Sequence, residues 1–262
     1  MRFGVLVLCT VIGCSGGQVE APKKAQPTPH VAPGTVVHES ARAAGGDLLR
    51  LKMKPGTVYD RRLTATIVTT APQGSKPPAG ALDTTTVAME YKAEVLGAGG
   101  GVQKVKITST PLKIEKPNAS GQWVPQGETG EITMDERGAV LTDVKGMVSG
   151  LYGVGIIPFP EKAIAKGSSW SSTSVRDMPP FGEVRIEEKF TFQGNAGDGL
   201  YRVDSTGTGS LGGMKINAKY LYRGADGSLH SADVFTSAEV SLPGDKAGSK
   251  IRLAVSLKVR PK

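Results

Sequence analysis

The sequence offers few side chains for catalysis or metal binding. Its 262 residues include 3 His and 2 Cys. His30 and His38 stand in a stretch rich in Pro and Ala, so His230 is the only histidine beyond residue 47. A general base needs a nucleophile and an orienting acid beside it, and a zinc site needs three or four protein ligands. We therefore predict no catalytic residue, no metal site and no cofactor, and we do not expect an enzyme.

Two ionisable residues nevertheless occupy apolar positions of predicted strands. Glu188 lies between Ile186 and Phe190, and His230 shares its parity with Ala232. A carboxylate that faces a pocket has a raised pKa and can serve a reaction. A bulge or a position at a barrel end explains Glu188 equally well, and a buried, hydrogen-bonded side chain is the usual explanation of an isolated histidine.

Two further motifs carry possible binding functions. Residues 207–212 read Gly-Thr-Gly-Ser-Leu-Gly, but a dinucleotide site needs a helix after this motif. The residues that follow alternate as a strand, so we predict no nucleotide site at this motif. Trp123 and Trp170 stand near turn residues, where they either cover the ends of a sheet or offer a stacking surface to a sugar or peptide.

The chain is basic, with 32 Lys and Arg against 24 Asp and Glu and a formal net charge of +8. The positive residues are spread over the polar faces of predicted strands. Such faces could contact anionic lipid headgroups, polysaccharide or another envelope polymer; they also protect edge strands from aggregation. No aromatic residues interleave with these charges, so we predict no nucleic-acid partner.

The elements that would position these residues are strands. From Leu48 onward apolar and polar residues alternate with a period of two, which is typical of strands with one buried face. The segments with this pattern are 59–67, 87–95, 105–107, 184–192, 214–222 and 251–259. Strands that bury one face and expose the other to water are typical of antiparallel sheets.

Clusters of Gly, Asn and Asp separate the strands, at 97–101, 135–138, 194–199 and 224–227, as expected for tight turns. We predict an all-β fold of antiparallel sheets, of the sandwich or open-barrel type. Two similar halves, 47–146 and 158–262, are suggested by a repeated order of strands and turns. At most one short helix is expected, around residues 143–152.

The segment 147–160 is apolar without alternation. It can be a short helix and crossover that fill the core between the halves. It can also be a flap beside a pocket for a lipid-like ligand, or a loop that touches a membrane.

The N-terminus carries a targeting signal. Met1-Arg2 precedes an apolar run, Phe3 to Ile12, which is too short to span a bilayer and has the length of a signal-peptide core. The run ends in Val11-Ile12-Gly13-Cys14, which resembles the lipobox of bacterial lipoproteins. The resemblance implies cleavage after Gly13 and lipidation of Cys14. Cys9 does not fit, because Leu8 stands where a small residue is needed.

The resemblance also implies the organisation of the chain. Residues 1–13 are the expected signal peptide, 14–46 the lipidated Cys14 and a flexible Pro- and Ala-rich tether, and 47–262 a β-rich globular domain. The expected location is the bacterial cell envelope, with the lipid anchor in a membrane and the outer membrane favoured.

The whole pattern resembles uncharacterised β-rich envelope lipoproteins, and the stretch from Phe159 to Trp170 is similar to one such family. No ligand-binding residue transfers from this resemblance. We expect a non-catalytic role in which the protein binds an envelope polymer, another protein or an apolar ligand, or supports envelope structure. The alternative is a carrier that holds a lipid or other apolar ligand in a sheet cavity; a hydrolase is a further, weaker alternative.

Overall fold

The computed structural model describes residues 36–39, 46–70, 83–115, 129–141, 156–177, 183–241 and 250–262. These residues form eleven strands and no helix, which confirms the predicted all-β class. The strands are β1 (Val36–Glu39), β2 (Val58–Thr70), β3 (Asp83–Gly99), β4 (Val102–Glu115), β5 (Thr129–Asp135), β6 (Ser169–Asp177), β7 (Glu183–Gly197), β8 (Leu200–Gly209), β9 (Met214–Arg223), β10 (Leu229–Ser241) and β11 (Lys250–Pro261). The short helix expected around residues 143–152 lies outside the described residues.

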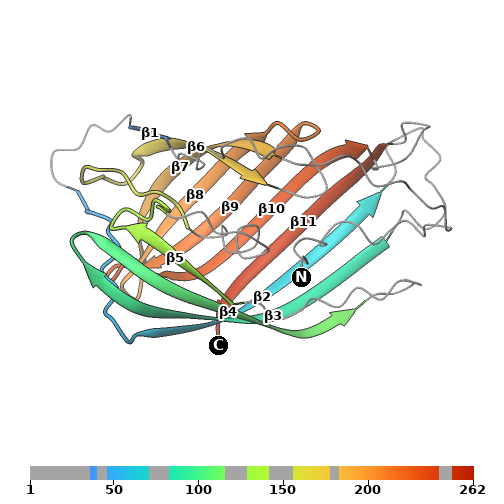
Figure 1. The fold of residues 1–262 in the computed structure, drawn as a ribbon. Coiled ribbons are helices and arrows are strands. Elements are labelled where there is room, and N and C mark those ends of the chain that lie inside the picture. Colours follow the sequence, from blue (N-terminus) through green and yellow to red (C-terminus); the bar gives the residue numbers. More distant parts are fainter. Residues whose placement is uncertain are drawn as a thin grey trace, which may run out of the picture.

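All eleven strands belong to one antiparallel sheet, in the order β1-β6-β7-β8-β9-β10-β11-β2-β3-β4-β5. The sheet curves strongly, but β1 and β5 at its edges are not paired with each other, so it is not closed into a barrel (Figure 1). Of the two predicted forms, the described strands adopt the open one and not the sandwich. The predicted halves 47–146 and 158–262 are parts of this one sheet, because β11 pairs with β2.

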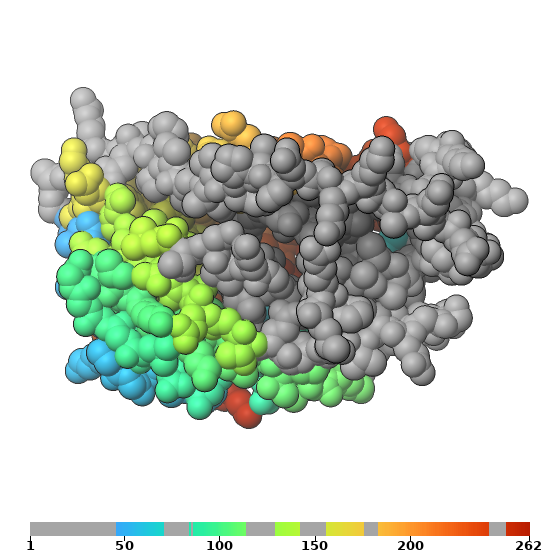
Figure 2. Space-filling model, in the orientation of Figure 1, coloured from blue at the N-terminus to red at the C-terminus, as the bar shows by residue number. Residues whose placement is uncertain are grey.

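Alternation along the strands separates a concave apolar face from a convex polar one. On β7, Val184, Ile186, Phe190 and Phe192 are each at most 4% exposed, and the residues of the opposite parity between Val184 and Phe192 are exposed or half-buried. The same alternation holds along β9 and β11. Figure 2 shows the residues of β3–β5 (green) along the lower part of the molecule and those of β6 (yellow) at its upper left.

The turns occur where the glycine clusters predicted them. The motif at residues 207–212 forms the end of β8 and the turn into β9, and β9 follows it as the predicted strand. Gly212 has a φ of 48°, and a Cβ there would lie 1.6 Å from the carbonyl oxygen of Glu239. Only glycine allows this approach of turn and strand, because it combines positive φ with the absence of a side chain.

One strand lies inside the segment predicted as a flexible tether. Residues Val36 to Glu39 form β1 and pair with Trp170 to Thr173 of β6. Two adjacent β-branched residues, Val36 and Val37, favour an extended backbone, and the edge of the sheet supplies the hydrogen-bonding partners. The rest of residues 1–45 lies outside the described part of the chain.

Several basic residues of the convex face form ion pairs with a neighbouring strand. Lys104 pairs with Glu131 at 2.6 Å, and Arg252 pairs with Glu239 at 3.0 Å. Arg260 pairs with Asp233 at 2.6 Å. Opposite charges on adjacent strands stabilise the pairing of those strands. Part of the excess of basic residues therefore stabilises the sheet.

Candidate functional site

Two segments without regular structure pack on the concave face. We name residues 46–54 the first inner segment and residues 156–164 the second inner segment. Asp47 and Ile164 exchange two backbone hydrogen bonds of 2.9 Å, which join the segments. The Arg50 guanidinium, only 9% exposed, donates to the carbonyl oxygens of Pro160 and Glu161. The segments therefore form one unit.

The turns of the sheet hold this unit in place. The backbone N–H of Leu51 donates to the backbone carbonyl oxygen of Glu136 at 2.7 Å. The backbone N–H of Lys52 donates to the backbone carbonyl oxygen of Asp226 at 2.8 Å. Gly227 has a φ of 69°, and a Cβ there would lie 2.1 Å from the carbonyl oxygen of Arg50. This glycine lets the turn between β9 and β10 lie directly against the first inner segment.

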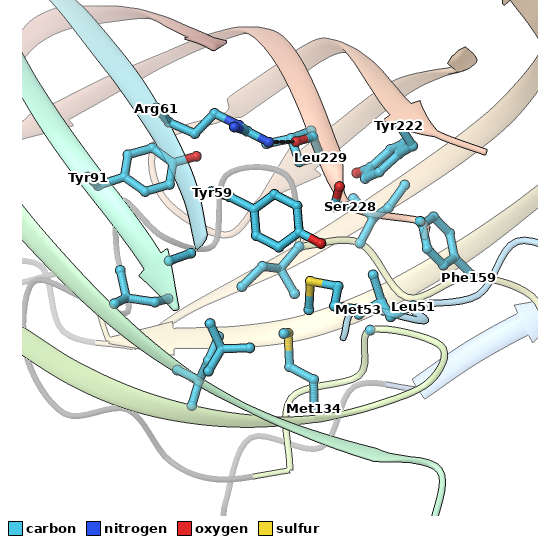
Figure 3. Close-up of a pocket in the computed structure, with 18 residues that line it drawn as sticks. Leu51, Met53, Tyr59, Arg61, Tyr91, Met134, Phe159, Tyr222, Ser228 and Leu229 are labelled. Atoms are coloured by element: carbon cyan, nitrogen blue, oxygen red, sulfur yellow. Dashed lines mark hydrogen bonds between the residues drawn. The ribbon is translucent and has the colours of Figure 1, made fainter. Parts of the chain in front are cut away.

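A cavity of about 100 Å³ remains between the inner segments and the sheet (Figure 3). It lies where two clusters of buried apolar residues meet. Leu51 and Tyr91 pack against both clusters and also line the cavity.

Apolar side chains form most of the cavity wall. Strands β3, β4 and β5 supply one side, the two inner segments another, and β9 together with the turn into β10 a third. The apolar lining residues are Leu51, Met53, Ala93, Val105, Ile107, Ile132, Met134, Ile156, Ile157, Phe159 and Leu229. Apolar cavities of this order take up small apolar molecules; one of about 150 Å³ binds benzene.

Polar groups gather at one end of the cavity. Tyr59 donates from its hydroxyl to Asp226 at 2.8 Å, and burial, then this hydrogen bond, raises the pKa of Tyr59 to about 12. The guanidinium carbons of Arg61 and Arg223 lie 5.6 and 5.9 Å from the centre of the Tyr59 ring, within the range of cation–π attraction. Ser228 donates from its backbone N–H to Asp226 at 2.9 Å.

Arg61 is the most buried charge at this end, with 4% of its surface exposed. Its Nη1 donates to the carbonyl oxygen of Asp60 at 2.9 Å, and its Nη2 donates to that of Leu229 (Figure 3). Burial lowers the pKa of Arg61. Tyr91 lies directly opposite Arg61 on β3, so both side chains point to the concave face.

His230 lies next to this polar end and occupies a bulge. The register of β10 against β9 shifts between Leu229 and Ser231, so His230 is the extra residue and does not continue the parity of Ala232. Its Nδ1 is buried without a hydrogen-bond partner in the described part of the chain. Burial lowers its pKa, and the charges of Arg223 and Arg61 lower it further.

Glu188 faces the concave side of β7, on the apolar parity, and is 9% exposed. Ser205 of β8 donates from its hydroxyl to Glu188 Oε1 at 3.1 Å. Gly207 makes room for it, because a Cβ there would lie 2.7 Å from Glu188 Cγ. Among the described residues, no hydrogen bond joins this pair to His230.

Trp170 is a structural anchor of the core. It is 2% exposed, its Nε1–H donates to the carbonyl oxygen of Pro158 at 2.8 Å, and its ring stacks on Phe190 with centroids 5.4 Å apart. A ring buried in this way offers no stacking face to a sugar. Trp123 and Cys14 lie outside the described residues.

The apolar segment 147–160 is described from residue 156 onward. Ile157 and Phe159 belong to the core, as expected of a core-filling segment. Ile156, Ile157 and Phe159 also border the cavity, as expected of a segment beside a pocket. This part of the segment thus contributes both to the core and to the cavity wall.

The described residues were compared with the requirements of a metal site and of a membrane-spanning helix. The described ranges hold no group of three or more His, Cys, Asp or Glu side chains placed to bind a metal ion. Within these ranges, no helix has the length and hydropathy of a membrane span.

The sequence analysis missed the cavity and its arginine, although one signal was present. Tyr59, Leu63 and Ala65 define the apolar parity of β2, and position 61 on this parity is an arginine. The same observation singled out Glu188 on β7. The cavity itself had no local signal, because it depends on how the two inner segments pack.

Comparison with known proteins assigns no family. The sequence matches no protein-family model, and no curated protein matches it.

Proposed function

We propose that the protein binds a small apolar ligand, or the apolar end of a larger one, in the cavity beneath its two inner segments. The observation that carries the proposal is the continuous apolar wall formed by β3, β4, β5 and these segments. A void in a core costs stability, since the atoms that line it lose contacts. An occupant would restore those contacts.

The proposed role is non-catalytic binding. It combines the two functions expected from the sequence, a non-catalytic binding role and a carrier of an apolar ligand. The described residues around the cavity supply aliphatic, aromatic and cationic side chains, with Asp226 already engaged by Tyr59 and Ser228. Such a lining favours holding a ligand. We further propose that Cys14 anchors the protein by lipid to a membrane of the bacterial envelope, where apolar ligands are abundant.

Binding is tested with the full chain carrying Cys14→Ser. This substitution removes the acceptor thiol, and with it any attached acyl chain that could itself enter the cavity. The probe is hexadecanol, a neutral long-chain alcohol, titrated against an apolar dye whose fluorescence rises in dry surroundings. We expect saturable displacement of the dye at one site, and no dye binding or displacement would overturn the proposal.

A cavity-filling variant locates the site. Ala93 lies on the concave face of β3 and lines the cavity, so Ala93→Leu adds three carbon atoms there. We expect at least a ten-fold loss of hexadecanol affinity. Ala254 lies on the opposite parity of β11 from Leu253 and Val255, on the convex face. Ala254→Leu is the matched control and leaves the affinity unchanged; equal losses in both variants would place the site elsewhere.

A further inference from the structure

The polar end of the cavity contains a buried cation without an acidic partner. Arg61 is 4% exposed, and its two described hydrogen bonds go to backbone carbonyl oxygens, those of Asp60 and Leu229. Within the described ranges no carboxylate forms an ion pair with it. Buried charges in proteins are normally paired, because the loss of hydration is otherwise uncompensated. Arg61 is a buried charge in the cavity wall that has no such ion pair.

A second cation increases the positive charge at the same place. Arg61 and Arg223 both lie within 6 Å of the centre of the Tyr59 ring. Asp226 is the acidic residue of this group, and its two oxygens already accept hydrogen bonds from Tyr59 and Ser228. Two guanidinium groups therefore share one engaged carboxylate.

An independent observation on another strand points in the same direction. His230, in the bulge of β10, has a buried Nδ1 without a hydrogen-bond partner in the described part of the chain. The carbonyl of the preceding residue, Leu229, accepts from Arg61. The residue with this ring nitrogen thus directly follows the residue whose carbonyl oxygen accepts from Arg61.

We infer that the ligand is a single-chain amphiphile with a carboxylate headgroup, which lies beside Arg61 while the first few carbon atoms of its alkyl chain fill the apolar part of the cavity, whose volume is about 100 Å³. The inference rests on the proposed function, since it names the ligand class of that cavity. The planar fork of a guanidinium matches the two oxygens of a carboxylate. The apolar side chains of β4 and β5 line the same cavity as Arg61 and suit an alkyl chain.

The test compares three probes on the full chain carrying Cys14→Ser. Hexadecanoate has both the chain and the acidic group, hexadecanol has the chain alone, and acetate has the acidic group alone. We expect hexadecanoate to bind at least ten-fold more tightly than hexadecanol at pH 8, and acetate not to compete at millimolar concentration.

Two neighbouring arginines of β2 supply a matched pair of variants. Arg61 faces the cavity, and Arg62 is exposed on the convex face. Arg61→Gln is expected to abolish the preference for hexadecanoate over hexadecanol, measured as the ratio of the two affinities in that variant. Arg62→Gln is expected to preserve the preference. If Arg61→Gln lowers both affinities equally, Arg61 is structural and the inference is overturned.

A measurement on the unsubstituted site covers the case in which Arg61→Gln does not fold. NMR titration of His230 reports the charge beside it, and the charged groups that act on this ring are Arg61 of β2 and Arg223 of β9. A bound carboxylate should raise the pKa of His230, and hexadecanol should not. An unchanged pKa with hexadecanoate bound would contradict the inference.

The failures of the two proposals are distinguishable. If hexadecanol and hexadecanoate bind equally, the headgroup inference falls and the apolar cavity stands as the binding site. If neither binds, the proposed function falls as well. If acetate binds as tightly as hexadecanoate, the site is one for free anions and the amphiphile is excluded.

Discussion

The hydroxyl of Tyr59 donates a 2.8 Å hydrogen bond to the carboxylate of Asp226. Tyr59 lies near the start of β2, and Asp226 lies in the turn between β9 and β10. Strands β10 and β11 separate these two elements in the sheet. The bond therefore spans the concave face and holds one end of the cavity wall.

A double-variant cycle measures this bond. Tyr59→Phe and Asp226→Ala are each expected to lower the free energy of unfolding by about 1–2 kcal/mol, because the first removes the donor and the second removes the acceptor of a hydrogen bond to a charged group. The double variant should lose less than the sum, since one bond is shared. Urea unfolding gives the values.

The control for this cycle is Asp204→Asn, which removes an exposed ion pair with Arg202 on β8. Its effect should stay within about 0.5 kcal/mol. Strict additivity of the Tyr59 and Asp226 substitutions would show that the bond contributes nothing to stability.

Gly227→Ala tests the contact between the β9–β10 turn and the first inner segment. The new Cβ would meet the carbonyl oxygen of Arg50 at 2.1 Å, in addition to the strain of positive φ. Gly213→Ala is the matched control, with a φ of 63° and open space around its Cβ. Thermal and urea unfolding should give a loss of about 1–2 kcal/mol for Gly213→Ala and a clearly larger one for Gly227→Ala. Similar losses would contradict the close approach.

Trp170→Phe tests the anchoring role of this ring. The variant loses the hydrogen bond to the Pro158 carbonyl and leaves space beside Phe190. We expect a loss of about 1–3 kcal/mol in free energy of unfolding. The neighbouring Ser171→Ala, a half-buried side chain of the opposite parity, should change stability by less than about 0.5 kcal/mol. A near-neutral Trp170→Phe would indicate that the ring is not part of the core.

The lowered pKa of His230 predicts that the protein loses stability in mild acid. Burial, Arg223 and Arg61 lower its pKa in the folded protein below the ordinary value of 6.5. As the pH falls through 6.5 towards the folded-state pKa, the unfolded chain binds the proton first, so the free energy of unfolding decreases. His230→Gln should remove this part of the pH dependence, measured as urea midpoints between pH 5 and 7.5. His30→Gln and His38→Gln should retain it; an unchanged profile in His230→Gln would contradict the prediction.

Cys14→Ser tests the proposed anchor. The wild-type chain should fractionate with membranes and take up a radiolabelled fatty acid, whereas Cys14→Ser should lose the label and leave the membrane fraction. Two or more acyl chains give stable attachment, so the change should be nearly complete. Cys9→Ser is the control and should behave as wild type. Membrane retention and labelling of Cys14→Ser would refute the anchor.

The strands could be predicted because their signal is local. Alternation on β7, β9 and β11 reflects one buried and one wet face, and each residue contributes to it independently. The glycine clusters likewise mark turns by their own backbone preferences. The edge strand β1 was missed, because four residues in a Pro- and Ala-rich stretch become a strand only through pairing with β6.

The order of strands and the cavity could not be predicted, because both depend on contacts between distant segments. Nothing near Leu257 indicates that Ala65 is its partner. Arg61 was detectable as a charge on an apolar parity, as Glu188 was. The two residues differ in their tertiary contacts. Ser205 donates a hydrogen bond to Glu188, whereas Arg61 has only backbone partners among its described hydrogen bonds.

The position of β11 sets the order in which the sheet can be completed. Strands β6 to β10 and strands β2 to β5 each form a run of neighbours along the chain, but only β11 pairs with both runs. A chain emerging from the ribosome therefore holds two incomplete sheets with the edges of β10 and β2 unpaired. Such edges are templates for aggregation. Strand β11 is the last of the described strands to be synthesised, and its pairing converts both edges into interior strands, so the docking of β11, rather than any earlier step, commits the molecule to one sheet.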